Sequence, residues 1–104
     1  MKRLIASDLH GSLACCRKLL DIYRKEGVHE LILLGDLVFS GSYDPRFEFD
    51  PQGVMALLNE EADHILCVEG NCDYGIRDLE PRFPFFRKYK TVVWAGREVF
   101  LTHG

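Results

Sequence analysis

Residues 31–36 read Leu-Ile-Leu-Leu-Gly-Asp, a continuous apolar run that stops at a glycine and an acidic residue. A short run without polar interruption is typical of a strand buried on both faces, as strands of parallel sheets are. Two similar runs lie before and after it along the chain, at residues 4–6 and 65–68. The first ends at Ser7 and Asp8, and the last is followed closely by Gly70 and Asn71. We therefore expect three parallel strands in one sheet.

The segments between these runs have the spacing of amphipathic helices. The first helix is expected over residues 12–26, with Ser12 as its cap and Gly27 at its end. Its apolar positions at helical spacing are Leu13, Cys16, Leu19, Leu20 and Tyr23. The second helix is expected to begin at Asp50 and Pro51, an N-cap followed by proline at the first helical position, and to run to about residue 61. Its inward positions are Val54, Leu57 and Leu58.

The order of these elements is strand, helix, strand, helix, strand, and a hairpin follows them. Residues 36–50 and 70–84 are expected to be loops. The hairpin is expected at residues 91–94 and 98–101, with Ala95 and Gly96 at its turn. Because crossovers between parallel strands are right-handed, the first part of the chain predicts a right-handed, mostly parallel α/β sheet.

The composition is that of one small globular domain. The 104 residues are 47% hydrophobic and 28% charged, which excludes a disordered segment. No apolar run reaches about 18 residues, and the run after Met1 is too short for a signal peptide, so we expect no association with membranes. The net charge of −3 offers no general attraction to nucleic acid. The four cysteines have no extracellular spacing pattern, which indicates reduced thiols and a cytoplasmic location.

Polar side chains are concentrated where the expected strands end. In strand order, the positions are Asp8 with His10, then Asp36, Asn71 and His103. In open α/β sheets, ligands bind beyond the carboxyl ends of the strands. Carboxylate, amide and imidazole donors together suit Mn²⁺, Fe²⁺ or Zn²⁺ better than Ca²⁺. Because two such ions can clamp a phosphate ester and activate water for in-line attack, the pattern predicts a metal centre for phosphoester chemistry.

Four short motifs, taken in this order, resemble the calcineurin-like metallophosphoesterase superfamily. They are Ser-Asp-Leu-His-Gly-Ser at residues 7–12, Leu-Gly-Asp at 34–36, Gly-Asn-Cys-Asp at 70–73 and Phe-Leu-Thr-His-Gly at 100–104. In detail they resemble its small bacterial phosphodiesterases of the YfcE type. Each motif alone is weakly specific, but four in order are strongly so, and the resemblance extends from Met1 to Gly104. It implies an α/β fold of the αββα sandwich kind, with the amino-terminal β-α-β-α-β and hairpin portion in this sequence.

The resemblance also implies a role for each site residue. Asp8 and His10 would hold a first divalent ion, and Asp36 would bridge it to a second. Asn71 and His103 would hold the second ion and are also the expected catalytic residues, with Asn71 near the phosphate. Mn²⁺ is the expected metal, with Fe²⁺, Zn²⁺ and Ni²⁺ as alternatives. The implied reaction is hydrolysis of phosphodiester, or phosphomonoester, bonds in small or nucleotide-like substrates.

One element of the family pattern does not occur in this sequence. The family has a Gly-His-x-His element in its second half, and those histidines complete both metal sites. We therefore interpret residues 1–104 as the amino-terminal part of a single metallophosphoesterase domain and expect an incomplete dinuclear site. The alternative is a non-catalytic remnant, or a scaffold of the same fold that binds partners. Self-association is expected through residues 83–89, an apolar stretch that would then lie exposed.

Several other residues near the motifs are expected to have structural roles. Cys72 stands where many superfamily members have histidine, and a thiol is a poor general acid at neutral pH. Asp73 is expected to orient the loop rather than bind metal, and the penultimate His103 to be frayed. Tyr43 and Arg46 lie in the loop after Asp36, where a solvated arginine is favoured over a phosphate contact. Surface positions are expected for His29 and His64, and core or helix positions for Cys15, Cys16 and Cys67.

Overall fold

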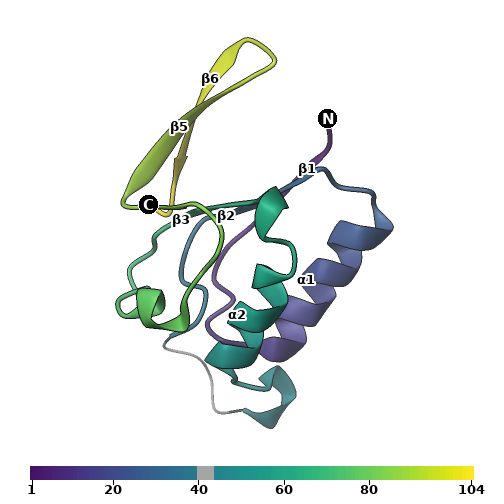
Figure 1. The fold of residues 1–104 in the computed structure, drawn as a ribbon, viewed down its shortest axis with the longest axis vertical. Coiled ribbons are helices and arrows are strands. Elements are labelled where there is room, and N and C mark those ends of the chain that lie inside the picture. The colour runs from purple at the N-terminus through teal and green to yellow at the C-terminus, as the bar shows by residue number, and fades with distance from the viewer. Residues whose placement is uncertain (40–43) are drawn as a thin grey trace.

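The architecture of the chain comes from a computed structural model that describes residues 1–39 and 44–104 (Figure 1). Within these residues the main sheet has four strands in the order β1-β2-β3-β4, and every neighbouring pair is parallel. The strands are β1 (Arg3–Ala6), β2 (Glu30–Leu33), β3 (Ile65–Val68) and β4 (Phe85–Phe86). A separate antiparallel pair consists of β5 (Tyr89–Trp94) and β6 (Arg97–Thr102). The expected parallel α/β sheet with a following hairpin is confirmed.

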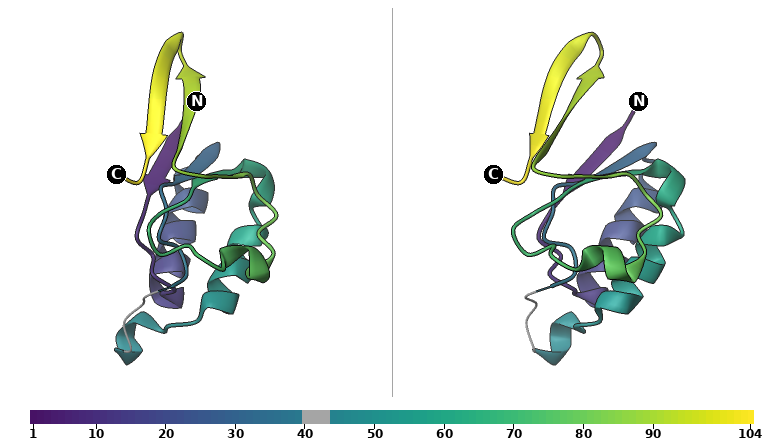
Figure 2. Two further views of the ribbon diagram at one scale, coloured as in Figure 1. Left: turned by 90° about the vertical axis from the view of Figure 1, so that its left-hand side faces the viewer. Right: turned by 60° about the vertical axis from the view of Figure 1, so that its left-hand side comes forward.

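The chain is arranged in three layers, as the views in Figures 1 and 2 show. Helices α1 (Leu13–Lys25) and α2 (Pro51–Asn59) cover one face of the main sheet, and the β5–β6 hairpin lies against the other. Strand β2 shows the alternation that this requires. Leu31 and Leu33 pack in the core beneath the helices, whereas Ile32 packs with Leu101 of β6. Among the residues described, neither helix is both long and apolar enough to cross a bilayer.

Both helices begin at the predicted caps. The Ser12 hydroxyl accepts a hydrogen bond from the Cys15 N–H at 3.1 Å, and the Asp50 carboxylate accepts one from the Gly53 N–H at 2.9 Å. Gly27, with a φ of +61°, follows the end of α1 as expected. Helix α2 ends earlier than the predicted residue 61, and a short 3₁₀ turn, Ala62–His64, leads into β3.

The hairpin turn also lies where the sequence places it. Ala95 and Gly96 both have positive φ, +51° and +76°, as a two-residue turn matched to the twist of the flanking strands requires. The two strands are longer than predicted, because pairing extends from Trp94 opposite Arg97 down to Tyr89 opposite Thr102.

The main difference from the sequence-based expectation lies in residues 70–89. The predicted loop contains a 3₁₀ turn, Ile76–Leu79, and is followed by β4, whose pairing with β3 the sequence does not reveal. The prediction that Phe83 lies in an exposed apolar patch is wrong, because its side chain is 5% exposed and belongs to the core beneath the helices. Phe85 and Phe86 are half-buried in β4, and Tyr89 is exposed. The exposed patch is therefore smaller than predicted, because Phe83 packs in the core and Phe85 and Phe86 are part of the main sheet.

Candidate metal centre

Four of the five predicted site residues meet beyond the carboxyl ends of β1 and β2. They are Asp8 and His10 after β1, Asp36 after β2 and His103 after β6. His10 Nε2 lies 3.2 Å from Asp8 Oδ1 and 3.8 Å from Asp36 Oδ2. His103 Nε2 lies 3.1 Å from the same Asp36 Oδ2 atom. One carboxylate oxygen of Asp36 is thus shared between two imidazole rings.

The loops that carry these residues continue the pairing of β1 and β2. The Asp8 N–H donates to the Gly35 carbonyl, and the His10 N–H donates to the Asp36 carbonyl, both at 2.9 Å. Asp8, His10 and Asp36 all have left-handed backbone conformations, with φ of +59°, +47° and +54°. Such residues cost on the order of 1–3 kcal/mol each and are found where surrounding contacts hold them, often at functional sites. The backbone of these three residues is therefore strained, and the hydrogen bonds between the two loops hold it in the conformation that brings their side chains together.

Both histidines are oriented by backbone carbonyls. His10 Nδ1 lies 3.0 Å from the Phe39 carbonyl oxygen, and His103 Nδ1 lies 2.6 Å from that of Leu34. Because a carbonyl can only accept, Nδ1 is the protonated nitrogen in each ring, and Nε2 faces the carboxylates. The prediction that His103 is frayed is therefore wrong, because its side chain is only 15% exposed and both ring nitrogens have partners.

The electrostatics of the cluster favour a cation. The hydrogen bond to Phe39, assisted by Asp8 and Asp36, raises the pKa of His10 above its ordinary value of 6.5. The Ser7 hydroxyl donates to Asp8 Oδ2 at 2.7 Å and, together with His10, lowers the pKa of that carboxyl. A neutral imidazole would direct the Nε2 lone pair at a carboxylate, which is repulsive unless a proton or a metal ion lies between them. The donors therefore fit a divalent metal of the kind bound by mixed nitrogen and oxygen ligands.

Cys72 is a ligand candidate that the sequence-based prediction did not include. Its Sγ atom, with ligand atoms of His10 and Asp36, forms a group that lies within 4.8 Å. A second group with the same spacing comprises Asp8, Asp36 and His103. The signal available in the sequence is the position of Cys72 in the Gly-Asn-Cys-Asp motif, between Asn71 and Asp73.

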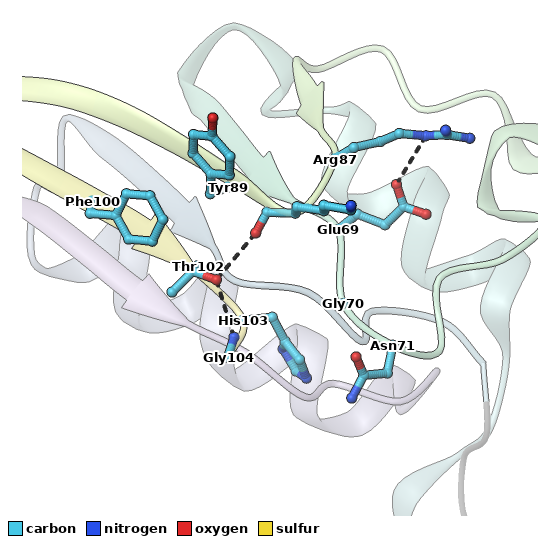
Figure 3. A pocket seen from close by; sticks show the side chains of 10 residues that line it. Glu69, Gly70, Asn71, Arg87, Tyr89, Phe100, Thr102, His103 and Gly104 are labelled. Atoms are coloured by element: carbon cyan, nitrogen blue, oxygen red, sulfur yellow. Dashed lines mark hydrogen bonds and ion pairs between the residues drawn. The ribbon is translucent and has the colours of Figure 1, made fainter.

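The fifth predicted residue, Asn71, lies at the edge of the cluster. It follows β3, is exposed, and lines a hollow of about 480 Å³ together with His103. Figure 3 shows His103 and Asn71 on one side of this hollow, with Tyr89 and Phe100 further along it. Arg87 also lines the hollow and pairs with Glu69 at 3.9 Å. The hollow is therefore continuous with the candidate centre.

The other residues named in the sequence analysis that the structure describes lie outside the carboxylate–histidine cluster. Asp73 is buried below the site, 1% exposed, and its carboxylate bonds to backbone rather than facing the cluster. Arg46 is exposed and pairs with Asp44, with a shortest separation of 2.6 Å, while Tyr43 lies outside the described residues. His29 and His64 are exposed, as predicted. Cys16 and Cys67 are fully buried and Cys15 is half-buried, also as predicted.

The α/β layers and the carboxylate–histidine cluster at the strand ends are typical of a metal-dependent phosphoesterase. A family model described as calcineurin-like phosphoesterase matches residues 1–103, and the chain belongs to this family. Phosphodiesterase YfcE of Escherichia coli K12 is 34% identical over 105 residues, and the same value is found for YfcE of the O157:H7 strain. The match covers 100% of this chain and 57% of those relatives, so the chain spans little more than half of their length.

Solved structures show the same relationship. The structure of YfcE, a phosphoesterase from E. coli, superposes with a TM-score of 0.89 at 33% identity, covering 100% of this chain and 58% of that one. A structure of an archaeal phosphodiesterase superposes with a TM-score of 0.66 at 24% identity, covering 100% of this chain and 59% of that one. The second likeness shows a shared fold. Together with the family match, these structures confirm the fold class predicted from the sequence.

Proposed function

We propose that the protein takes part in metal-dependent hydrolysis of phosphodiester bonds in a small or nucleotide-like substrate. The single observation that carries the proposal is the position of Asp36. Its Oδ2 atom faces both His10 and His103, and Asp36 belongs to both groups of ligand atoms. A carboxylate shared in this way is what a bridge between two metal ions needs.

The division of the ligands between two ions follows the family resemblance: Asp8 and His10 would hold the first, Asn71 and His103 the second, and Asp36 both. The ligand atoms that lie within 4.8 Å of one another divide differently, since Asp8 groups with His103 and His10 with Cys72, and Asp36 belongs to each group. Mn²⁺ is the proposed metal, because oxygen and imidazole donors predominate and Cys72 is the lone thiol among them. When bound, two divalent ions supply the positive charge that polarises a phosphoryl oxygen and activates water.

The chain itself supplies orientation and charge around the substrate. The amide of Asn71 is exposed where the hollow adjoins His103, so it can donate a hydrogen bond to a phosphoryl oxygen. His103 is held by Leu34 and Asp36, which fixes the direction of its ring. Lys88 lines the same hollow and adds a positive charge that favours an anionic substrate, whereas the charge of Arg87 is offset by Glu69, which also lines the hollow.

Two finer points belong to the same proposal. The sequence contains no Gly-His-x-His element, so we expect residues 1–104 alone to hold an incomplete centre and to turn over slowly. All four cysteines are unpaired, which supports a reducing compartment such as the cytoplasm.

The test is metal retention followed by turnover. Protein loaded with Mn²⁺ and desalted is analysed for metal, and bis-(p-nitrophenyl) phosphate is the substrate. We expect bound Mn²⁺ and Mn²⁺-dependent release of p-nitrophenol, both lost by about 100-fold in Asp36→Asn. Asp63→Asn, at an exposed position after α2, is the matched control and should behave as the wild type does. The proposal would be contradicted if the wild type neither retained Mn²⁺ nor released p-nitrophenol. Rapid turnover by the wild type would contradict the expectation that the centre in residues 1–104 is incomplete.

A further inference from the structure

Asp73 is a buried carboxylate that the proposed chemistry does not use. It is 1% exposed and follows β3 in the loop of residues 70–73. Its carboxylate accepts three backbone hydrogen bonds: from Asp36 at 2.8 Å, from Leu37 at 2.9 Å and from Gly70 at 2.6 Å. A buried carboxylate with this many backbone donors holds those donors in place, because each would otherwise lose its partner.

The donors come from the two loops that form the candidate centre. Asp36 and Leu37 belong to the loop after β2, and Gly70 belongs to the loop after β3. In the opposite direction, the Cys72 N–H donates to Asp36 Oδ1 at 2.7 Å. The other Asp36 oxygen, Oδ2, is the atom that faces His10 and His103. One oxygen of Asp36 is thus occupied by the loop of Asp73, and the other is directed into the centre.

The loops are in close contact, which leaves little freedom for Asp36. A Cβ atom placed on Gly35 would lie 2.4 Å from the Gly70 nitrogen, and one on Gly70 would lie 2.5 Å from Asp36 Oδ1. Asp36 also has a strained left-handed backbone, with φ of +54°, at the N–H that Asp73 binds. The hydrogen bonds to Asp36 and Leu37 hold that conformation in place.

We propose that Asp73 is a positioning residue that acts through Asp36. By binding the N–H groups of Asp36 and Leu37 it fixes the left-handed turn, and this turn directs Asp36 Oδ2 between the two histidines. The inference rests on the proposed function, since it assigns Oδ2 to metal binding. Groups that orient a ligand in this way, without touching the ion, commonly alter metal affinity by about 10–100-fold.

The variant that tests this is Asp73→Asn, which keeps the size of the side chain but turns one acceptor oxygen into a donor. The expected result is a loss of Mn²⁺ affinity of about 10–100-fold, measured by electron paramagnetic resonance titration of free Mn²⁺. Asp78→Asn, an exposed change in the following 3₁₀ turn, is the matched control and should retain wild-type affinity. Leu58→Ala, in the core beneath the helices, should lower the melting temperature without lowering Mn²⁺ affinity, which separates positioning from general stability.

A second measurement on metal-free protein separates this inference from the proposed function. The amides of Asp36 and Leu37 should be protected from hydrogen exchange in the wild type and exchange at least about 10-fold faster in Asp73→Asn. In the wild type, scalar couplings across the hydrogen bonds should join these amides to the Asp73 carboxyl carbon, a readout that remains if the variant does not fold.

Three results would overturn the inference: equal Mn²⁺ affinity in the wild type and Asp73→Asn, unchanged amide exchange in that variant, or no such couplings in the wild type. Failure of the wild type to bind Mn²⁺ would instead overturn the proposed function, and the exchange and coupling data would still decide the role of Asp73.

Discussion

Asp36 and Asp73 each accept a hydrogen bond from the loop that carries the other. The Asp36 N–H donates to Asp73 Oδ2 at 2.8 Å, and the N–H of Cys72, next to Asp73, donates to Asp36 Oδ1 at 2.7 Å. The pairing joins the loops after two neighbouring strands into one rigid unit beside the candidate centre. A change in either loop should therefore affect both.

The His103→Gln substitution tests whether the hairpin contributes to the centre. It removes the Nε2 atom that lies 3.1 Å from Asp36 Oδ2, and with it the imidazole donor of the proposed second ion. Mn²⁺ affinity, measured by isothermal titration calorimetry, should fall by about 10-fold or more. His64→Gln, at an exposed position before β3, should leave the affinity unchanged. Equal affinities in the two variants would exclude a contribution from His103.

A pair of glycine substitutions separates backbone strain from steric conflict. Gly27 and Gly35 both have positive φ, +61° and +97°, but a Cβ on Gly27 meets nothing within 4 Å, whereas one on Gly35 lies 2.4 Å from the Gly70 nitrogen. Gly27→Ala should cost about 1–2 kcal/mol in urea unfolding. Gly35→Ala should cost at least twice as much, because the two loops must also move apart. Similar costs for the two variants would show that the loops are not in tight contact.

The protonation of His10 should make the stability of the metal-free protein depend on pH. The Phe39 carbonyl, with Asp8 and Asp36, raises the pKa of His10 above 6.5 in the folded state. The protonated His10 ring therefore stabilises the folded state. This contribution is complete at a pH below the pKa of His10 in the unfolded chain, and it is lost as the pH rises through the pKa of His10 in the folded chain. In urea unfolding with a chelator present, His10→Gln should lose more stability at about pH 5.5 than at about pH 8.5. A loss independent of pH would contradict the interaction.

The four cysteines should divide into two reactive and two protected thiols. Cys16 and Cys67 are fully buried, and burial raises the pKa of the Cys16 thiol to about 11 and that of Cys67 well above its ordinary value. Cys15 and Cys72 are half-buried. At about pH 8, Ellman's reagent should therefore modify two thiols per folded chain, and all four after denaturation. Rapid reaction of all four in the folded protein would show that the core opens easily.

Most of the fold could be predicted because its signals are local. Ser12 and Asp50 are caps that act within three residues, and the apolar run at residues 31–33 is typical of a strand of a parallel sheet and is fully buried. Strand β4 could not be predicted in this way. It is two residues long, too short for a periodicity, and it exists because Phe85 and Phe86 pair with Cys67 and Val68. Such pairing depends on tertiary contacts that the local pattern does not contain.

The candidate site could be predicted in part for a related reason. Asp8 and Asp36 follow adjacent parallel strands, so the topology alone places them together. The packed position of His103 could not be predicted, because its ring is held by a carbonyl 69 residues earlier in the chain. The place of Cys72 beside His10 and Asp36 likewise depends on the hydrogen bonds between two loops.

Trp94 gives the molecule a built-in optical reporter. It is the single tryptophan of the chain, it packs where the hairpin meets the main sheet, and the Arg3 guanidinium lies 4.2 Å from its ring centre. The emission of an indole shifts to longer wavelength when water reaches it, so undocking of the β5–β6 hairpin should be visible without a label. Because β6 leads directly to His103, the fluorescence of Trp94 can show in real time whether metal binding at the candidate centre changes the packing of the hairpin on the main sheet.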